Sequence, residues 1–301
     1  MSRRFWETKR RGEAGTAHLQ EVIVLNRFIG RIVAAAGVAI LLSLAFVVAD
    51  AQTVGSPAGV PNAATALGAP AQAPPVRRTA DGHPDLSGFW QAMNTANYDV
   101  QSHSAQKDVP AGLGVVAGNE LPYQPSALAK KKENAANRQT LDTEAKCFLP
   151  GVPRIMYMPH PFQVVQTPGT IMMLFEYAHA TRNIFMNKPH PRGPIEWWMG
   201  DSRGHWEGDT LVVDVVHFND QTWFDRAGNF HSEALHVVER YTLMDQDHLN
   251  FTATVEDPKV FTRPWTMNMV LYRHREPNFQ LLDYECYAFA LDEEPIVPPT
   301  R

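Results

Sequence analysis

Residues 195–243 contain most of the side chains that could carry out chemistry in this chain. Within them, residues 200–204 read Gly-Asp-Ser-Arg-Gly, which matches the G-x-S-x-G motif of α/β-hydrolases and contains the Gly-Asp-Ser block of another class of serine esterases. Asp245 and His248 supply an Asp-x-x-His pair for such an esterase. Both classes need alternating strands and helices around the serine, whereas residues 205–212 predict a β-hairpin. The sequence therefore disfavours a serine hydrolase.

Two histidines begin and end the segment His231-Ser-Glu-Ala-Leu-His236. The zinc-protease motif H-E-x-x-H is one residue shorter and places both histidines on one face of a helix. A loop that runs into a strand does not supply that geometry, although a metal-dependent hydrolase through His231, His236 and a remote carboxylate stays an alternative. Because histidine titrates near neutral pH, either side chain could instead move a proton. A purely structural role for His231 would be to order the loop around Gly228.

The strand predicted over residues 234–243 places one carboxylate among apolar side chains. Successive side chains of a strand point to opposite faces. The face that carries Glu239 also carries Leu235, Val237, Tyr241 and Leu243. A carboxylate there costs free energy unless it is paired or hydrogen-bonded, so Glu239 is our first candidate for a functional interior residue. The alternative is a structural ion pair with Arg182, Arg203 or Arg273.

These candidates suit a cofactor-free lyase, isomerase or hydrolase. Glu239 or His231 would move a proton while an arginine stabilises developing negative charge. The predicted catalytic residues are Glu239, His231, His236 and Asp201. The predicted substrate-binding residues are Arg203, Arg240, Trp206, Trp223 and Tyr241. No cofactor or metal enters this first hypothesis.

Methionine and tryptophan are frequent in and beside the predicted strands. Such side chains usually fill a core, and they also line adaptable pockets for apolar ligands. We therefore expect a small, largely apolar molecule as the partner. A second hypothesis is a carrier or envelope protein without catalysis, in which Glu239 pairs with an arginine and no titratable side chain opens into the cavity.

The sequence before residue 161 contains one convincing helix, and the sequence after it consists of short β-prone runs. The helix is expected at residues 126–138, on the surface and capped by Ser126. We expect strands at residues 85–90, 162–167, 170–177, 181–187, 203–206, 210–217, 234–243, 249–256, 266–273 and 280–288. Their connections are too short for crossover helices, so neighbouring strands should be antiparallel. The expected fold is mainly β, an up-and-down barrel or a strongly curved sandwich.

The N-terminal part predicts export. Residues 32–49 form an uncharged apolar run that follows Arg27 and Arg31 and ends in the cleavage pattern Ala49-Asp50-Ala51. Residues 1–51 therefore resemble a secretory signal peptide. A translation start near Val24 would shorten this signal peptide to an ordinary length. An uncleaved membrane anchor is the alternative. Residues 52–80 are rich in Ala, Pro and Gly and predict a disordered linker before one domain over residues 81–301. We expect a periplasmic or secreted protein without stable membrane insertion after cleavage.

The net charge limits which partners are expected, and the two cysteines predict a covalent link. Without residues 1–51 the chain carries 20 Lys and Arg against 28 Asp and Glu, a formal charge of −8. An acidic chain without a basic stripe argues against nucleic-acid binding. Cys147 and Cys286 are its two cysteines, and in an oxidising compartment such a pair is more often a disulfide than a metal site. The alternative is a pair of thiols.

Longer blocks of this sequence resemble a large family of exported bacterial proteins that carry no assigned reaction. The blocks are residues 85–90, 147–154, 200–214, 218–223, 231–241, 256–258 and 263–265, and the resemblance spans about residues 80–290. It departs from the family at Asn187-Lys-Pro-His190, where Asp-Gly-Arg is expected before the His-Pro pair. The resemblance implies a lipocalin-like β-barrel.

Overall fold

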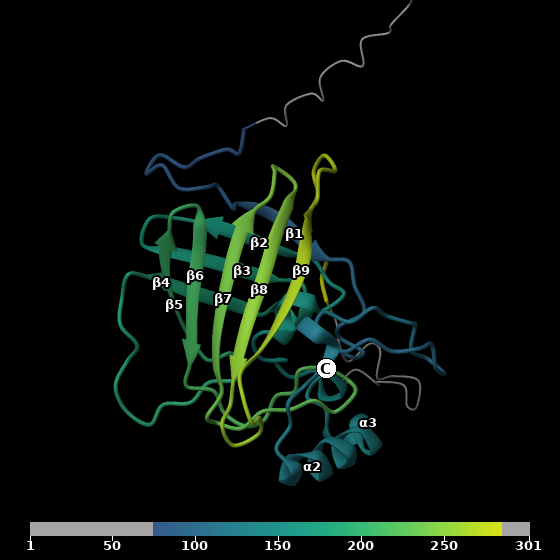
Figure 1. Cartoon of the computed structure of the whole chain (residues 1–301). Coiled ribbons are helices and arrows are strands. Elements are labelled where there is room, and N and C mark those ends of the chain that lie inside the picture. Colours follow the sequence, from purple (N-terminus) through teal and green to yellow (C-terminus); the bar gives the residue numbers. More distant parts are fainter. Residues whose placement is uncertain (1–74, 285–301) are drawn as a thin grey trace, which may run out of the picture. The chain divides into compact units, whose positions relative to one another are not determined.

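Nine strands close into one barrel in the computed structural model, which describes residues 75–284 (Figure 1). The strands are β1 (Gly88–Ala92), β2 (Phe162–Gln166), β3 (Thr170–Phe175), β4 (Thr181–Met186), β5 (Asp201–Glu207), β6 (Thr210–Val216), β7 (His236–Leu243), β8 (His248–Glu256) and β9 (Trp265–Arg273). They follow one another around the ring in chain order, and β9 pairs with β1. The mainly β fold is confirmed, as a barrel and not a sandwich.

One neighbouring pair departs from the antiparallel pattern that the sequence predicted. β4 and β5 run parallel, with Ile184 opposite Ser202 and Met186 opposite Gly204, whereas the other eight pairings are antiparallel. The reason is parity, because a closed ring with an odd number of strands cannot alternate direction throughout. Residues 187–200 carry the chain back along the barrel without a helix, so a crossover helix is not required here.

Two turns confirm the local sequence signals. Gly208 has a φ of 59°, which suits the tight turn between Glu207 and Thr210, the last residue of β5 and the first of β6. Pro168-Gly169 joins β2 to β3, and the Thr167 N–H donates to the carbonyl of Thr170. Residues 75–80, which the sequence placed in the linker, already contact the barrel, because Arg78 forms an ion pair of 2.7 Å with Asp209.

The strand and helix boundaries differ from expectation at both ends of the domain. β1 begins at Gly88 and not at residue 85, and residues 280–284 form no strand, while 285–288 lie outside the described residues. The helix α2 (Pro125–Ala136) begins with its proline at the first helical position, so Gln124 and not Ser126 is the N-cap. It ends at Ala136, and a separate short helix, α3 (Arg138–Leu141), follows. Figure 1 shows both helices beyond one end of the barrel.

Alternation of side chains builds the core. In β8, residues 249, 251, 253 and 255 are buried and residues 248, 250, 252 and 254 are half-buried. The barrel interior is filled with aromatic, aliphatic and methionine side chains, among them Trp90, Phe162, Met173, Val213, Tyr241, Phe251, Met267 and Leu271. Full burial of one such side chain contributes about 1.5–3 kcal/mol, so the methionine-rich interior is explained by packing.

The structure describes no helix in residues 75–284 that is long and apolar enough to cross a membrane. The predicted signal peptide lies outside the described residues.

Candidate functional site

The carboxylate that the sequence singled out lies inside the barrel and is paired. Glu239 is fully buried, and its oxygens accept hydrogen bonds of 2.6 and 3.2 Å from Arg182, which is also buried. Arg182 donates further to Ser202 Oγ at 3.0 Å and to the Tyr241 hydroxyl at 3.4 Å. We call Arg182, Ser202, Glu239 and Tyr241 the interior cluster. Ser202 of the Gly-Asp-Ser block is thus an inward-facing strand residue that contacts an arginine.

The positive and the negative charge of the interior cluster balance each other. Burial disfavours the Arg182 cation, but the adjacent Glu239 carboxylate outweighs burial and raises the pKa of Arg182. Burial, together with the Glu239 charge, raises the pKa of Tyr241 well above its ordinary value. Every charged group here has a buried partner, which is the structural ion pair that we named as the alternative. A catalytic role for Glu239 stays a prediction.

Three other predicted residues meet on the outer side of the barrel. Asp201 accepts hydrogen bonds from Arg203 at 2.6 and 2.7 Å and lies 2.6 Å from His190 Nδ1. The other ring nitrogen of His190 lies 2.8 Å from Asp214, whose second oxygen lies 2.9 Å from His236 Nε2. Burial alone would raise the pKa of Asp201, but its hydrogen bonds with Arg203 and His190 outweigh burial and lower it.

This outer network holds a loop in place. Each ring nitrogen of His190 faces a carboxylate oxygen, so neither nitrogen is left to take a proton from a substrate. His190 belongs to residues 187–200, which carry the chain from β4 to β5. The network therefore fastens that return loop to β5 and β6. Within this loop, His190 is the residue that makes the contacts to both strands.

His231 is separate from His236. It is buried, its Nδ1–H donates to the Ser232 carbonyl at 2.9 Å, and Nε2 accepts from the Thr222 hydroxyl at 2.7 Å. Burial lowers the pKa of His231, so the neutral ring is the favoured form. Among residues 75–284 no group of three or more His, Cys, Asp and Glu is placed to hold a metal ion. The geometry gives the metal-dependent alternative no set of ligands.

The remaining predicted binding residues are dispersed. Arg240 is exposed and donates to Glu207 at 2.8 Å. Trp206 stacks on His83 with ring centroids 4.7 Å apart, and Trp223 is buried beside Phe230 in an isolated bridge. The structure therefore does not gather Arg240, Trp206, Trp223 and Tyr241 into one site.

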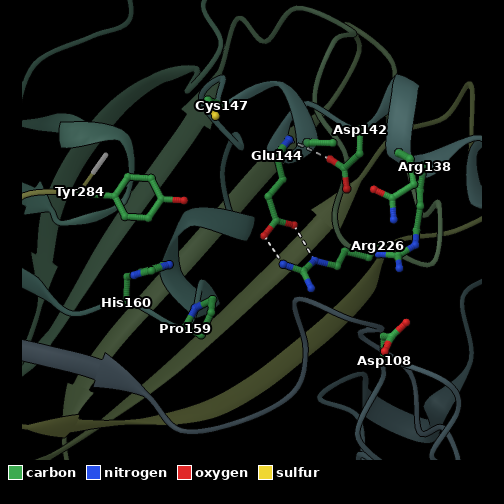
Figure 2. Close-up of a pocket in the computed structure, with 11 residues that line it drawn as sticks. Asp108, Arg138, Asp142, Glu144, Cys147, Pro159, His160, Arg226 and Tyr284 are labelled. Carbon is green, nitrogen blue, oxygen red and sulfur yellow. Dashed lines mark hydrogen bonds and ion pairs between the residues drawn. The ribbon is translucent and has the colours of Figure 1, made fainter. Parts of the chain in front are cut away.

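A cavity of about 610 Å³ lies instead between α3 and the residues that precede β2 (Figure 2). Among the described residues it is lined by Asp108, Arg138, Gln139, Asp142, Glu144, Ala145, Cys147, Pro159, His160, Arg226 and Tyr284. Its volume is in the range of pockets that hold small organic ligands. We call it the α3 pocket. Figure 2 shows His160 and Tyr284 on one side of it and Glu144 with Arg226 on the other.

Glu144 organises the charged wall. Its oxygens accept from Arg226 at 2.5 and 2.8 Å, from Arg154 at 2.6 Å, and from the Asn97 amide at 3.1 and 3.2 Å. Arg154 is fully buried behind the wall and also forms a two-bond pair with Asp142. Burial would raise the pKa of Glu144, but Arg226 and Arg154 outweigh it and hold that pKa below its ordinary value. Glu144 is therefore a fixed anion that positions two guanidinium groups.

The opposite wall carries a carboxylate–histidine dyad. His160 lies just before β2 and Glu176 just after β3, and these strand ends pair, with Phe162 opposite Phe175. Glu176 Oε1 lies 3.3 Å from His160 Nδ1, while Oε2 accepts the Leu282 N–H at 2.9 Å. A carboxylate only accepts, so Nδ1 of His160 is the donor. His160 Nε2 has no hydrogen-bond partner within residues 75–284 and remains able to bind a proton.

Aromatic rings hold this histidine in place. The Tyr284 and Tyr177 rings contact the imidazole with centroids 4.9 and 5.8 Å away. Burial raises the pKa of Tyr284, so its hydroxyl stays protonated at neutral pH. A neutral phenol beside a carboxylate-oriented imidazole is an arrangement that can exchange protons with a bound molecule.

No sequence motif marks the α3 pocket. His160, Glu176 and Arg226 lie in loops or next to strand ends, and Glu144 begins a single turn of 3-10 helix (Glu144–Lys146). No apolar period marks the direction of side chains in such segments. The available signals were indirect, namely a histidine between Pro159 and Pro161 and the block 147–154 beside it. Cys147 lines the pocket, but Cys286 lies outside the described residues, so their disulfide stays a prediction.

No protein-family model, no curated protein and no solved structure matches this chain, so the resemblance to a family also stays a prediction.

Proposed function

We propose that this protein binds a small organic molecule in the α3 pocket and moves a proton on it, with His160 as the general base. The observation that carries the proposal is the His160–Glu176 dyad, whose Nε2 is available beside a 610 Å³ cavity. In the proposed step, Nε2 takes a proton from the substrate or from a water. The imidazolium that forms is stabilised by Glu176, and the proton is later returned to the product.

The proposed class of reaction is the one expected from the sequence, that of a cofactor-free isomerase, lyase or hydrolase. The proposed site differs, because it lies in the α3 pocket and not at Glu239 or His231. Tyr284 on the same wall supplies a protonated hydroxyl near the base. The interior cluster is unsuited to this work because each of its charges already has a buried partner.

The test uses the full chain and a His160→Gln variant. Two assays cover the reaction classes: solvent deuterium incorporation into a panel of enolisable carbonyl compounds, followed by NMR, and hydrolysis of a panel of esters and lactones. Removing the base should lower the rate on any accepted compound by about 10²–10⁴-fold. His205→Gln is the matched control, since His205 is an exposed strand histidine outside the pocket.

Equal rates for wild type and His160→Gln on every accepted compound would refute the catalytic proposal. Ligand binding that survives both substitutions, without turnover by either protein, would favour the carrier hypothesis.

Export and the disulfide belong to the same proposal. The sequence pattern of residues 1–51 supports a periplasmic or secreted protein, and Tyr284, close to Cys286 in the chain, lines the same pocket as Cys147. N-terminal sequencing of the protein from fractionated cells should find a mature start near Gln52. Intact mass after thiol alkylation should show no modified cysteine before reduction. An intact N-terminus in the cytoplasmic fraction, or two alkylated thiols, would contradict these points.

A further inference from the structure

We infer that the molecule held in the α3 pocket is an organic carboxylate, with Arg138 and Arg226 as its anion-binding groups. The inference rests on the proposed function, because it names the substrate class of the same site.

The pocket carboxylates nearest to the arginines are already neutralised. Asp142 is buried and holds Arg154 through bonds of 2.7 and 3.0 Å, and Glu144 holds both Arg154 and Arg226. Asp108 at the rim is exposed, where water and salt screen it. The anions of the charged wall are thus used in positioning guanidinium groups and are not left to repel a second anion.

Arg226 is held in place by its neighbours, and one nitrogen of its guanidinium group has no partner among the described residues. Glu144 takes its Nε and Nη2, and its guanidinium packs over the Tyr98 ring at 4.7 Å. Within residues 75–284, Nη1 of Arg226 has no hydrogen-bond partner. A guanidinium held on both sides loses little further freedom when it binds an oxyanion, which favours Arg226 as a preorganised donor.

Arg138 supplies the unneutralised charge. It is half-buried, and it makes no ion pair with any of the residues that the structure describes. Arg138 and Arg226 also line an adjoining cavity of about 270 Å³, so the two side chains face the same spaces. Figure 2 shows them on the side of the pocket opposite His160 and Tyr284.

The cationic groups and the base lie on opposite sides of the pocket (Figure 2), which is the arrangement that proton abstraction from a carboxylate substrate requires. Two guanidinium groups offer planar N–H donors that match a carboxylate, while the base lies across the cavity. The anchor therefore binds one end of the substrate and leaves the other end beside His160 Nε2. The ring of Tyr284 lines the pocket on the side of the base, which suits a substrate that carries an apolar group next to its reacting atom.

The experiment compares small carboxylates with carboxamides of nearly the same shape. Benzoate and benzamide, phenylacetate and phenylacetamide, and hexanoate and hexanamide are titrated into the full chain, with binding followed by ligand-observed NMR. At least one carboxylate should bind tenfold or more tightly than its amide, on the order expected for a charge-assisted hydrogen bond. Arg138→Gln should remove that preference and Arg138→Lys should retain part of it.

Arg263→Gln is the matched control, because Arg263 is an exposed arginine paired with Glu120 and does not line the pocket. Its carboxylate preference should equal that of the wild type. The inference is overturned if no carboxylate in the panel binds better than its amide, or if Arg138→Gln keeps the wild-type preference. Because His160→Gln should still prefer carboxylates, a loss of turnover without loss of this preference separates the anchor from the base.

Discussion

Two arginine–glutamate pairs in this protein have the same chemistry and different surroundings. In the interior cluster, the side chains of Arg182 and Glu239 are 2% and 0% exposed. In the α3 pocket, those of Arg226 and Glu144 are 29% and 13% exposed. The first pair lies among core side chains, whereas the second borders a cavity and leaves Nη1 of its arginine without a partner among the described residues.

The difference shows that burial of a charge is a weak guide to function by itself. The buried pair joins β4 to β7 inside the barrel, and both of its side chains are almost entirely shielded from solvent. A pair at the edge of a cavity holds one group so that its remaining donor is available. The interior cluster therefore explains part of the fold, and the pocket pair belongs to the candidate site.

The largest effect is expected from Glu239→Gln. It leaves the Arg182 cation buried without a counter-charge, and breaking a buried pair in this way costs about 3–5 kcal/mol. Urea unfolding should show the loss, while pocket binding by the folded fraction should be unchanged. A variant with wild-type stability and no activity would instead make Glu239 a functional residue and would remove the contrast between the two pairs.

A smaller effect is expected from Glu144→Gln. The substitution weakens the charged hydrogen bonds from Arg226 and Arg154 and should lower the free energy of unfolding by about 1.5–3 kcal/mol. The loss is smaller than for Glu239→Gln because the site is partly open and Arg154 keeps its pair with Asp142. The pKa of Glu144 is lowered in the folded state, so its contribution is present above its ordinary pKa of 4.5 and is lost as pH falls through the folded value.

Urea midpoints measured between pH 7 and pH 2 test this. The wild type should lose more stability than Glu144→Gln in the acid limb below about pH 4.5. Carboxylate binding should fall in the variant at pH 7 as well, because Arg226 loses its support. Parallel acid limbs for the two proteins would contradict the assigned role.

The smallest effect is expected from Arg240→Ala. Its pair with Glu207 is exposed on both sides, and such pairs contribute about 0.2–1 kcal/mol. Turnover should be unchanged, since Arg240 does not line the α3 pocket. A fall in turnover at unchanged stability would bring the outer side of the barrel into the site, as the sequence first suggested.

Sequence periodicity was sufficient for a mainly β fold and for the inward face of Glu239, but it left a barrel and a curved sandwich as alternatives, between which the structure decides. Alternation in residues 234–243 put Glu239 on the inward face, and burial in β7 confirms it. It could not reveal the parallel β4–β5 pair, which follows from the number of strands and not from any local residue. It also missed His160 and Glu176, because their meeting depends on the pairing of β2 with β3 and on which loop ends that register brings together.

The closure of the ring between its first and last strands has a consequence for how the chain folds. Trp90 in β1 pairs with Arg273 in β9, so the seam joins nearly the two ends of the described chain. Such distant contacts are formed against a large loss of chain entropy and are associated with slow folding. During synthesis, the first strand and the most recently formed strand therefore remain unpaired edges of the sheet until the final strand emerges. Such edges can pair with other chains. Synthesis that stalls before residue 273 would yield a protein prone to aggregation, however well its first eight strands are made.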